Sequence, residues 1–185
     1  TTYPTNIGTG MRASIVLHLP ASSKSKSFSK LVSNAGRFGV VIKGIHGEGR
    51  ENFGSLFEVS NPKTLGLKEK EILDTVTKVA NQLNTNEMQL REALLKEKRL
   101  EKQDETYKSY GVLKYARKLS LKDSLTYLSS IMMGSADNLI KLNEPNILYS
   151  LMIGSGSSNL LKIANRPVTE DEIDEIRAGY IRENL

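Results

Sequence analysis

The stretch NIGTGMRASIVLHL, residues 6–19, places a glycine loop and one arginine directly before a β-branched, apolar run. A second stretch, KGIHGEG at residues 43–49, joins glycines to a lysine, a histidine and a glutamate. Glycine loops let a backbone approach a ligand closely and offer it N–H groups. A fixed cation beside such a loop suits a polyphosphate, and a fixed carboxylate suits a proton acceptor. Together the two stretches predict a site that moves a phosphoryl group.

Two better-known phosphate-binding motifs are excluded, one by its structural context and the other by its absence from the sequence. Gly8, Gly10 and Ala13 fit the dinucleotide pattern G-x-G-x-x-G/A, which requires a strand before it and a helix after it. Here residues 3–6 are typical of a loop, and residues 13–19 are typical of a strand. The sequence also contains no G-x-x-x-x-G-K-[ST], so a P-loop is excluded as well.

The first half of the chain alternates strand-like and helical patterns. Strands are predicted over residues 13–19, 40–45 and 53–59, with a helix over residues 22–38. Their short connections favour an antiparallel sheet covered by helices. A long helical pattern follows from residue 68 to about residue 102, and Asn84-Thr85-Asn86 is expected to interrupt it.

The second half of the chain is predicted to be entirely helical. The predicted helices cover residues 104–118, 121–133, 144–153, 157–164 and 169–184. Ser120 and Thr169 are the expected N-caps of two of them. The predicted fold class is therefore α+β: an antiparallel sheet flanked by helices over residues 1–103, followed by a small all-α domain over residues 104–185.

Composition bounds the class of protein. The 185 residues are 38% hydrophobic and 25% charged, as in a soluble globular protein, and the net charge is a modest +5. Basic and acidic side chains are interleaved, which disfavours a nucleic-acid-binding arm. The absence of cysteine excludes disulfides and thiolate metal sites and fits the cytoplasm, and no apolar run is long enough to span a membrane. Because Thr1 falls inside the motif region, we expect a C-terminal fragment of a longer protein.

The motifs resemble one known family. PTNIGTGMRAS at residues 4–14 and K-G-x-x-G-E-G at residues 43–49 resemble the C-terminal part of the ATP:guanido phosphotransferases, and within them the bacterial protein arginine kinases of the McsB type. Further matching markers are Ser60-Asn61, Thr64-Leu65-Gly66, the run SYGVL at residues 109–113, and the tail elements Asp174-x-x-Arg177-Ala178 and Ile181-Arg182-Glu183.

The resemblance implies a chemistry and a nucleotide site. The enzyme would transfer the γ-phosphoryl group of ATP, with Mg, to arginine side chains of proteins. The nucleotide-binding residues would be Arg12, Ala13, Ser14, Ile15, Val16, Lys43, Gly44, Ile45, His46, Gly47 and Glu48. Arg12 would neutralise charge on the phosphates. Glu48 would be a catalytic carboxylate, since a guanidinium with a pKa above about 12 must lose a proton. No residue of the chain is assigned as a metal ligand.

Two positions depart from the family pattern. Lys43 stands where most relatives carry an arginine, and lysine keeps the charge but loses the bidentate fork. Tyr3 stands where the family carries a cysteine close to the substrate, and a phenol is neutral at pH 7. From Lys43 we expect weaker nucleotide binding. From Tyr3, and because the resemblance places a second catalytic carboxylate in an N-terminal lobe that these residues do not include, we expect the isolated fragment to be inactive. The alternative function is a catalytically impaired module that binds nucleotide or phosphoarginine without turnover.

The last predicted helix carries a second candidate site. Asp174, Arg177 and Ala178 share one helix face through their i, i+3, i+4 spacing. The resemblance implies that an R-D-x-x-R-A element here binds phosphoarginine, with aspartate holding the guanidinium and arginine the phosphate. Ile173 replaces the first arginine, so half of the phosphate grip is missing. The alternative is an exposed salt bridge within the helix.

The resemblance also implies partners. They are arginine-bearing protein substrates such as a heat-shock repressor, a zinc-containing activator protein, and the Clp ATPase and protease, for which phosphoarginine is a degradation tag. Membrane and direct nucleic-acid partners are not expected. A homodimer is left open.

Overall fold

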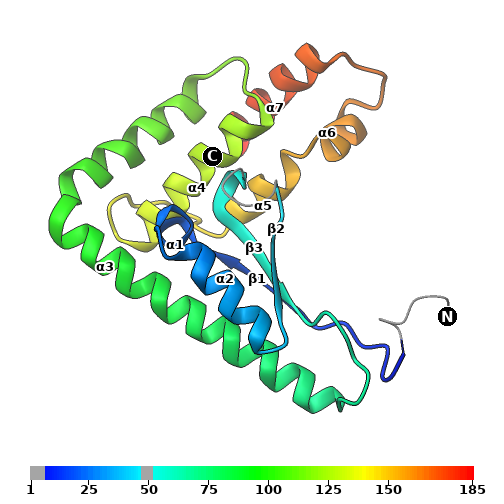
Figure 1. The fold of residues 1–185 in the computed structure, drawn as a ribbon. Helices are drawn as coiled ribbons and strands as arrows, with labels where there is room; N and C mark the ends of the chain where they lie inside the picture. Colours follow the sequence, from blue (N-terminus) through cyan, green and yellow to red (C-terminus); the bar gives the residue numbers. More distant parts are fainter. Residues whose placement is uncertain (1–6, 47–51) are drawn as a thin grey trace. The chain divides into compact units, whose positions relative to one another are not determined.

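The computed structural model describes residues 7–46 and 52–185 and confirms an α+β fold with a small antiparallel sheet (Figure 1). The elements follow in the order β1 (Ser14–His18), α1 (Pro20–Lys24), α2 (Phe28–Arg37), β2 (Val41–Gly44), the 3₁₀ turn η3 (Phe53–Ser55), β3 (Leu56–Ser60), α3 (Glu69–Tyr115), α4 (Leu121–Ala136), α5 (Ile147–Gly154), α6 (Ser157–Ala164) and α7 (Glu170–Asn184). The chain forms two compact units, one up to residue 94 and one from residue 95.

The sheet has the order β1-β3-β2, and β3 is antiparallel to both of its neighbours. β3 begins at Leu56, later than predicted, because Gly54 and Ser55 adopt positive φ angles of 83° and 53° and form a turn. Val59 lies opposite both Ile15 and Ile42, so these three side chains share one face.

That face is the core of the first unit. Val59 packs with Ala35 of α2 and with Val76, Val79 and Leu83 of α3. The period-2 pattern of the strands and the 3.6-residue period of α3 therefore bring their apolar sides together. On the opposite face of the sheet Glu58 lies between its cross-strand partners Val16 and Lys43, and the candidate site lies on this face.

The single helix predicted over residues 22–38 is wrong, because two helices stand there. Pro20 occupies the first turn of α1, where its missing N–H costs nothing. The Ser25 and Ser27 hydroxyl groups then lie 2.8 Å apart, and the Ser27 N–H donates to Ser25 Oγ at 3.2 Å. These local bonds give the backbone an alternative to the helical ladder, so the chain turns before α2 begins.

The interruption predicted at residues 84–86 is also wrong. Thr85 lies within the 47-residue helix α3, and its hydroxyl donates to the Asn81 carbonyl at 3.0 Å, as a hydroxyl inside a helix does. The irregularity falls instead at Lys98, whose φ and ψ are −136° and 35°. The division between the two compact units falls a few residues earlier in the sequence, between residues 94 and 95, whereas the domain boundary at residue 103 stays a prediction.

Both expected N-caps of the second unit are confirmed. Ser120 Oγ accepts the Asp123 N–H at 3.0 Å at the start of α4. Thr169 forms a capping box with Glu172: the Glu172 carboxylate accepts the Thr169 N–H at 2.8 Å, and Thr169 Oγ1 accepts the Glu172 N–H at 3.3 Å. The pKa of the Glu172 carboxyl group is lowered, chiefly by the bond from the Thr169 N–H and next by a hydrogen bond from the Arg166 side chain.

The second unit buries an all-helical core. Its fully buried side chains include Leu125, Leu128, Ile131, Leu148, Leu151 and Leu160. Gly134 of α4 faces Thr106 of α3, and a Cβ built on the glycine would lie 2.4 Å from Thr106 Cγ2, so only glycine permits this approach. None of the helices within the described ranges combines the length and the apolar content that crossing a bilayer requires.

Candidate phosphate-binding site

An open, polar cavity of about 290 Å³ lies between the glycine loop, β2 and the end of β3. It is lined by Gly10, Met11, Arg12, Val41, Lys43, Ser60, Asn61, Pro62, Lys63 and Thr64. Three of these side chains are cations, on three different segments of the chain. The structure thus brings the predicted residues Arg12 and Lys43 to one cavity and adds Lys63, which sequence reasoning missed.

The glycine loop is held against the segment that follows β3. Thr64 is buried, and its hydroxyl donates to the Ile7 carbonyl at 2.7 Å. Gly8 pairs with Thr64 in an isolated bridge and has a φ of 104°. A Cβ at Gly8 would lie 2.7 Å from the Thr64 carbonyl oxygen, so both the backbone angle and the close approach require glycine.

Arg12 makes an exposed ion pair beside the cavity. Its Nη2 donates to both carboxylate oxygens of Glu58, at 3.0 and 3.2 Å. The side chains are 64% and 26% exposed. Exposed pairs of this kind contribute about 0–1 kcal/mol, so an incoming phosphate can take the place of the carboxylate. Glu58 also lies directly opposite Lys43 in the sheet, and one carboxylate therefore sits between two of the three cations.

The other residues predicted on β1 divide between the two faces of the sheet. Ser14 and Val16 are exposed, and Val16 lies opposite Glu58 on the face of the cavity. Ala13 and Ile15 pack instead against the buried core. Alternation along a strand makes this division unavoidable, so the five consecutive residues 12–16 cannot all present side chains to one ligand.

The second predicted loop is described only up to His46. Gly44 ends β2, and the Ile45 N–H donates to the Leu56 carbonyl at 3.0 Å. The His46 N–H donates to Asn52 Oδ1 at 3.3 Å, and burial lowers the pKa of the His46 imidazole. Gly47, Glu48 and Tyr3 lie outside the described residues, and the roles predicted for them stay predictions.

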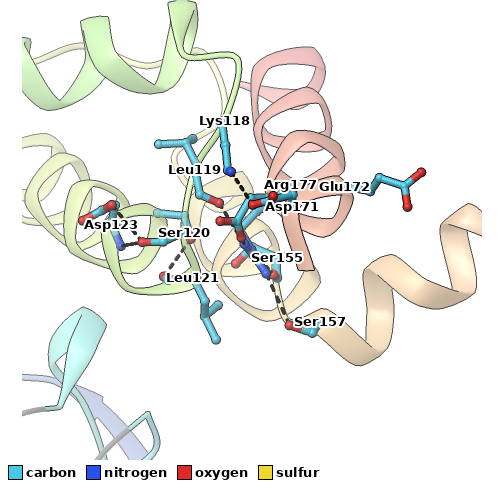
Figure 2. Close-up of polar contacts among 12 residues, drawn as sticks. Lys118, Leu119, Ser120, Leu121, Asp123, Ser155, Ser157, Asp171, Glu172 and Arg177 are labelled. Atoms are coloured by element: carbon cyan, nitrogen blue, oxygen red, sulfur yellow. Dashed lines mark hydrogen bonds and ion pairs between the residues drawn. The ribbon is translucent and has the colours of Figure 1, made fainter. Parts of the chain in front are cut away.

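The candidate phosphoarginine site on α7 centres on a buried arginine (Figure 2). Arg177 is 2% exposed. Its Nε donates to the Ser155 carbonyl at 2.9 Å, its Nη1 to the Leu119 carbonyl at 2.8 Å and to the Asp174 carboxylate, and its Nη2 to Ser157 Oγ at 3.3 Å. The pair of Arg177 with Asp174 is therefore not the exposed salt bridge considered as the alternative.

Further bonds tie α7 to the connection between α3 and α4. The Leu119 N–H donates to the Asp174 carbonyl at 3.1 Å, and Arg182 Nη1 donates to the Ala116 carbonyl at 2.7 Å. Lys118 pairs with Asp171 at 2.5 Å, and this hydrogen bond raises the pKa of Lys118 (Figure 2). Ala178, the third predicted residue, is fully buried.

The side chains that line the cavity are of the kind that binds phosphate. Cationic side chains and a glycine loop line the cavity, which fits the phosphates of a nucleotide. Within residues 7–46 and 52–185 no three carboxylate or imidazole groups are placed to hold a metal ion. The charges that line the cavity therefore suit an anionic group such as a phosphate.

Two family models match adjoining parts of the chain. Residues 1–90 match the ATP:guanido phosphotransferase C-terminal catalytic domain, and residues 97–185 match the protein-arginine kinase McsB C-terminal domain. Between them the two matches cover both compact units. The chain belongs to the ATP:guanido phosphotransferase family, in its protein-arginine kinase branch.

Curated relatives agree with this assignment. Proteins named protein-arginine kinase from Desulforamulus reducens, Halalkalibacterium halodurans and Bacillus subtilis are 40%, 38% and 37% identical to the chain over 185 residues. Each alignment covers 100% of this chain but only 51–52% of the relative. The chain therefore spans about half the length of the curated relatives that it matches.

Proposed function

We propose that this chain is the nucleotide-holding portion of a protein-arginine kinase, which transfers the γ-phosphoryl group of ATP to arginine side chains of proteins. One observation carries the proposal: Arg12, Lys43 and Lys63 line a single polar cavity beside a glycine loop. Three convergent cations in an open pocket suit the polyphosphate of a nucleotide better than any neutral ligand. Membership of the guanido phosphotransferase family supports the same ligand.

The residues of the cavity have separable roles in this proposal. Arg12 and Lys43 neutralise the phosphate oxygens as charge develops on the transferring group. Magnesium, when bound with the nucleotide, neutralises further phosphate charge. A guanidinium nitrogen of the acceptor arginine forms the new bond to the γ-phosphorus as the bond to the leaving ADP oxygen breaks. Glu48 accepts the proton that the guanidinium loses.

Calorimetry with Mg·ADP tests the nucleotide site. Charge-assisted contacts to phosphate are worth about 1.5–3 kcal/mol each, so Arg12→Ala is expected to weaken binding about tenfold or more. Arg37→Ala is the matched control, since Arg37 is an exposed arginine in the last turn of α2 and does not line the cavity. Equal ADP affinity of the Arg12→Ala variant and the unaltered chain would refute the phosphate role.

The alternative function is a module that binds nucleotide without turnover. Lys43 in place of arginine and Tyr3 in place of cysteine support it, because lysine lacks the bidentate fork that grips phosphate and a phenol is neutral where a thiolate would be negative. The discriminating measurement is transfer of label from γ-labelled ATP to an arginine-rich acceptor protein. Acid-labile label on the acceptor would support the kinase, whereas ADP binding without transfer would support the module.

We also propose that Asp174, Arg177 and Ala178 contribute to phosphoarginine binding, as the family pattern suggests. Asp174 is the most accessible of the three, because its side chain is 27% exposed. Free phosphoarginine should then shift amide resonances of residues 169–182, and arginine should not. Ile173→Arg, which restores the family residue, should tighten binding by about 1.5–3 kcal/mol. Unchanged spectra with phosphoarginine would refute this role.

The proposed partners follow from the same chemistry. A kinase that marks arginine would act on a heat-shock repressor and other arginine-bearing proteins, respond to an activator protein, and deliver its products to a Clp ATPase and protease in the cytoplasm. Retention of an arginine-phosphorylated protein on the immobilised chain, lost after the phosphate is removed, would support the link between the mark and this chain.

A further inference from the structure

We propose that Asn61 is a positioning residue that aims Arg12 at the phosphates of the nucleotide. The proposal rests on the proposed function, since it assumes that Arg12 binds phosphate. It goes further by assigning a role to the Asn61 side chain, which lies outside β3 and carries no charge. The role follows from where the two ends of its amide group are bonded.

The Asn61 side chain holds the backbone on both sides of Arg12. Its Oδ1 accepts the Ala13 N–H at 2.8 Å, which belongs to the peptide group after Arg12. Its Nδ2 donates to the Met11 carbonyl at 3.0 Å, which belongs to the peptide group before Arg12. One planar amide thus fixes both peptide groups that determine the direction of the Arg12 side chain. Nδ2 also lies 3.3 Å from the Lys63 carbonyl.

Arg12 needs such an anchor because it lies beyond the paired part of β1. The β1–β3 ladder begins at the pair Ser14 and Ser60. The next main-chain bond, from the Asn61 N–H to the Ala13 carbonyl, is long at 3.4 Å. On the other side Gly10 has a φ of 67° and no neighbour within 4 Å of its Cβ position, so it gives the loop little restraint. The amide of Asn61 therefore replaces the ladder where the ladder has ended.

Positioning of this kind affects affinity through pre-organisation. An arginine at the end of a glycine loop samples many directions, and each must be lost when phosphate binds. Holding its backbone in advance removes part of that cost. Asn61 should thus strengthen nucleotide binding only when the Arg12 side chain is present.

A double-mutant cycle on the 185-residue chain tests this dependence. Asn61→Ala, Arg12→Ala and the double variant are compared by calorimetry with Mg·ADP. We expect Asn61→Ala to weaken binding about five- to tenfold in the unaltered chain, and less than twofold once Arg12 is alanine. The amide proton of Ala13, which loses its acceptor, should exchange faster in Asn61→Ala while the rest of the spectrum is retained.

Asn52→Ala is the matched control for a merely structural effect. The Asn52 side chain makes a similar pair of hydrogen bonds to the backbone in the same unit. Its Oδ1 accepts the His46 N–H, and its Nδ2 donates to the Leu56 carbonyl at 2.7 Å. Its effect on ADP binding should be the same with and without Arg12. If Asn61→Ala does not fold, Asn61→Gln, which keeps both polar groups one methylene further out, takes its place with the same expectation.

The outcomes separate this inference from the proposed function. Loss of affinity in Arg12→Ala together with no loss in Asn61→Ala would overturn the positioning role and leave the phosphate site standing. Equal losses from Asn61→Ala in both backgrounds would also overturn it. An Arg12→Ala variant that binds ADP normally would overturn the proposed phosphate role itself.

Discussion

Two arginines, one in each compact unit, illustrate opposite uses of the same side chain. Arg12 is largely exposed and pairs with a single carboxylate, that of Glu58. Arg177 is almost fully buried and bonds to two main-chain carbonyls, one hydroxyl and one carboxylate. The two carbonyls belong to residues 22 and 58 positions away along the chain. Arg177 therefore connects three separate segments of its unit, whereas the Arg12 side chain is described as bonding to Glu58 alone.

The two arginines therefore differ in what it would cost each of them to leave its present partners. Replacing Glu58 by a phosphate costs Arg12 only a weak, solvent-screened pair. Withdrawing Arg177 would leave the carbonyls of Leu119 and Ser155 without their donor inside the unit, and unsatisfied buried groups are costly. Arg12 can thus leave its partner for a ligand at little cost, whereas Arg177 can contribute to a ligand site only from the position in which it also holds its unit together.

Among the variants considered, Arg177→Ala is expected to have the largest effect, which is a loss of stability. Arg177→Ala should lower the free energy of unfolding of residues 95–185 by about 3–5 kcal/mol, because it removes one partner of a buried charged network. Arg177→Lys should recover only part of this, since a lysine lacks the fork that reaches three segments. Amide hydrogen exchange of α4 to α7 measures the loss.

Arg12→Ala serves as the control for that experiment. Its effect on exchange in the first unit should correspond to less than about 1 kcal/mol, as expected for an exposed pair. An Arg177→Ala variant with unchanged protection would mean that the buried bonds of Arg177 contribute little to the stability of its unit.

A histidine, unlike an arginine, can lose its charge when burial disfavours the charged form. His18 ends β1, and burial, assisted by the positive charge of Arg91, lowers its pKa to about 4. Because the unfolded imidazole has a pKa near 6.5, the unfolded state binds more protons between pH 6.5 and 4, so stability falls as the pH falls through that range. The loss should reach about 2–3 kcal/mol at the acid end.

Imidazole proton resonances measure this directly, since the chain has only two histidines. The His18 signal should titrate near pH 4, and the His46 signal should titrate below its ordinary value of 6.5. His18→Gln should remove that part of the acid destabilisation. A His18 signal that titrates near 6.5 would contradict the assignment.

Among the variants considered, Glu58→Gln is expected to have the smallest effect, which is a change in nucleotide affinity. Glu58→Gln removes the carboxylate that competes with phosphate for Arg12 and that faces Lys43 across the sheet. Binding of Mg·ADP should become about two- to fivefold tighter, in keeping with an exposed pair worth less than about 1 kcal/mol. The gain should shrink in Arg12→Ala. Weaker binding by Glu58→Gln would show that the carboxylate supports the ligand rather than competing with it.

Features set by near neighbours in the chain could be predicted from the sequence. The three strands follow from apolar or alternating runs, and Ser120 and Thr169 cap helices through bonds to residues only three positions away. Arg12 and Lys43 could be proposed as phosphate ligands because each adjoins a glycine loop. The break in the helix predicted over residues 22–38 was missed, because a proline start and two serine hydroxyls outweighed the apolar spacing.

By itself the sequence determined the α+β class, the glycine loop with its arginine, and the face of α7 on which Asp174 and Arg177 lie, because each depends on periodicity or on adjacent residues. Only the tertiary structure decided that Asn61, Glu58 and Lys63 join Arg12, since antiparallel pairing of β1 with β3 brings together residues nearly fifty positions apart. It also decided that Arg177 is buried. Helical spacing specifies which residues share a face, whereas the segments that pack over that face come from elsewhere in the chain.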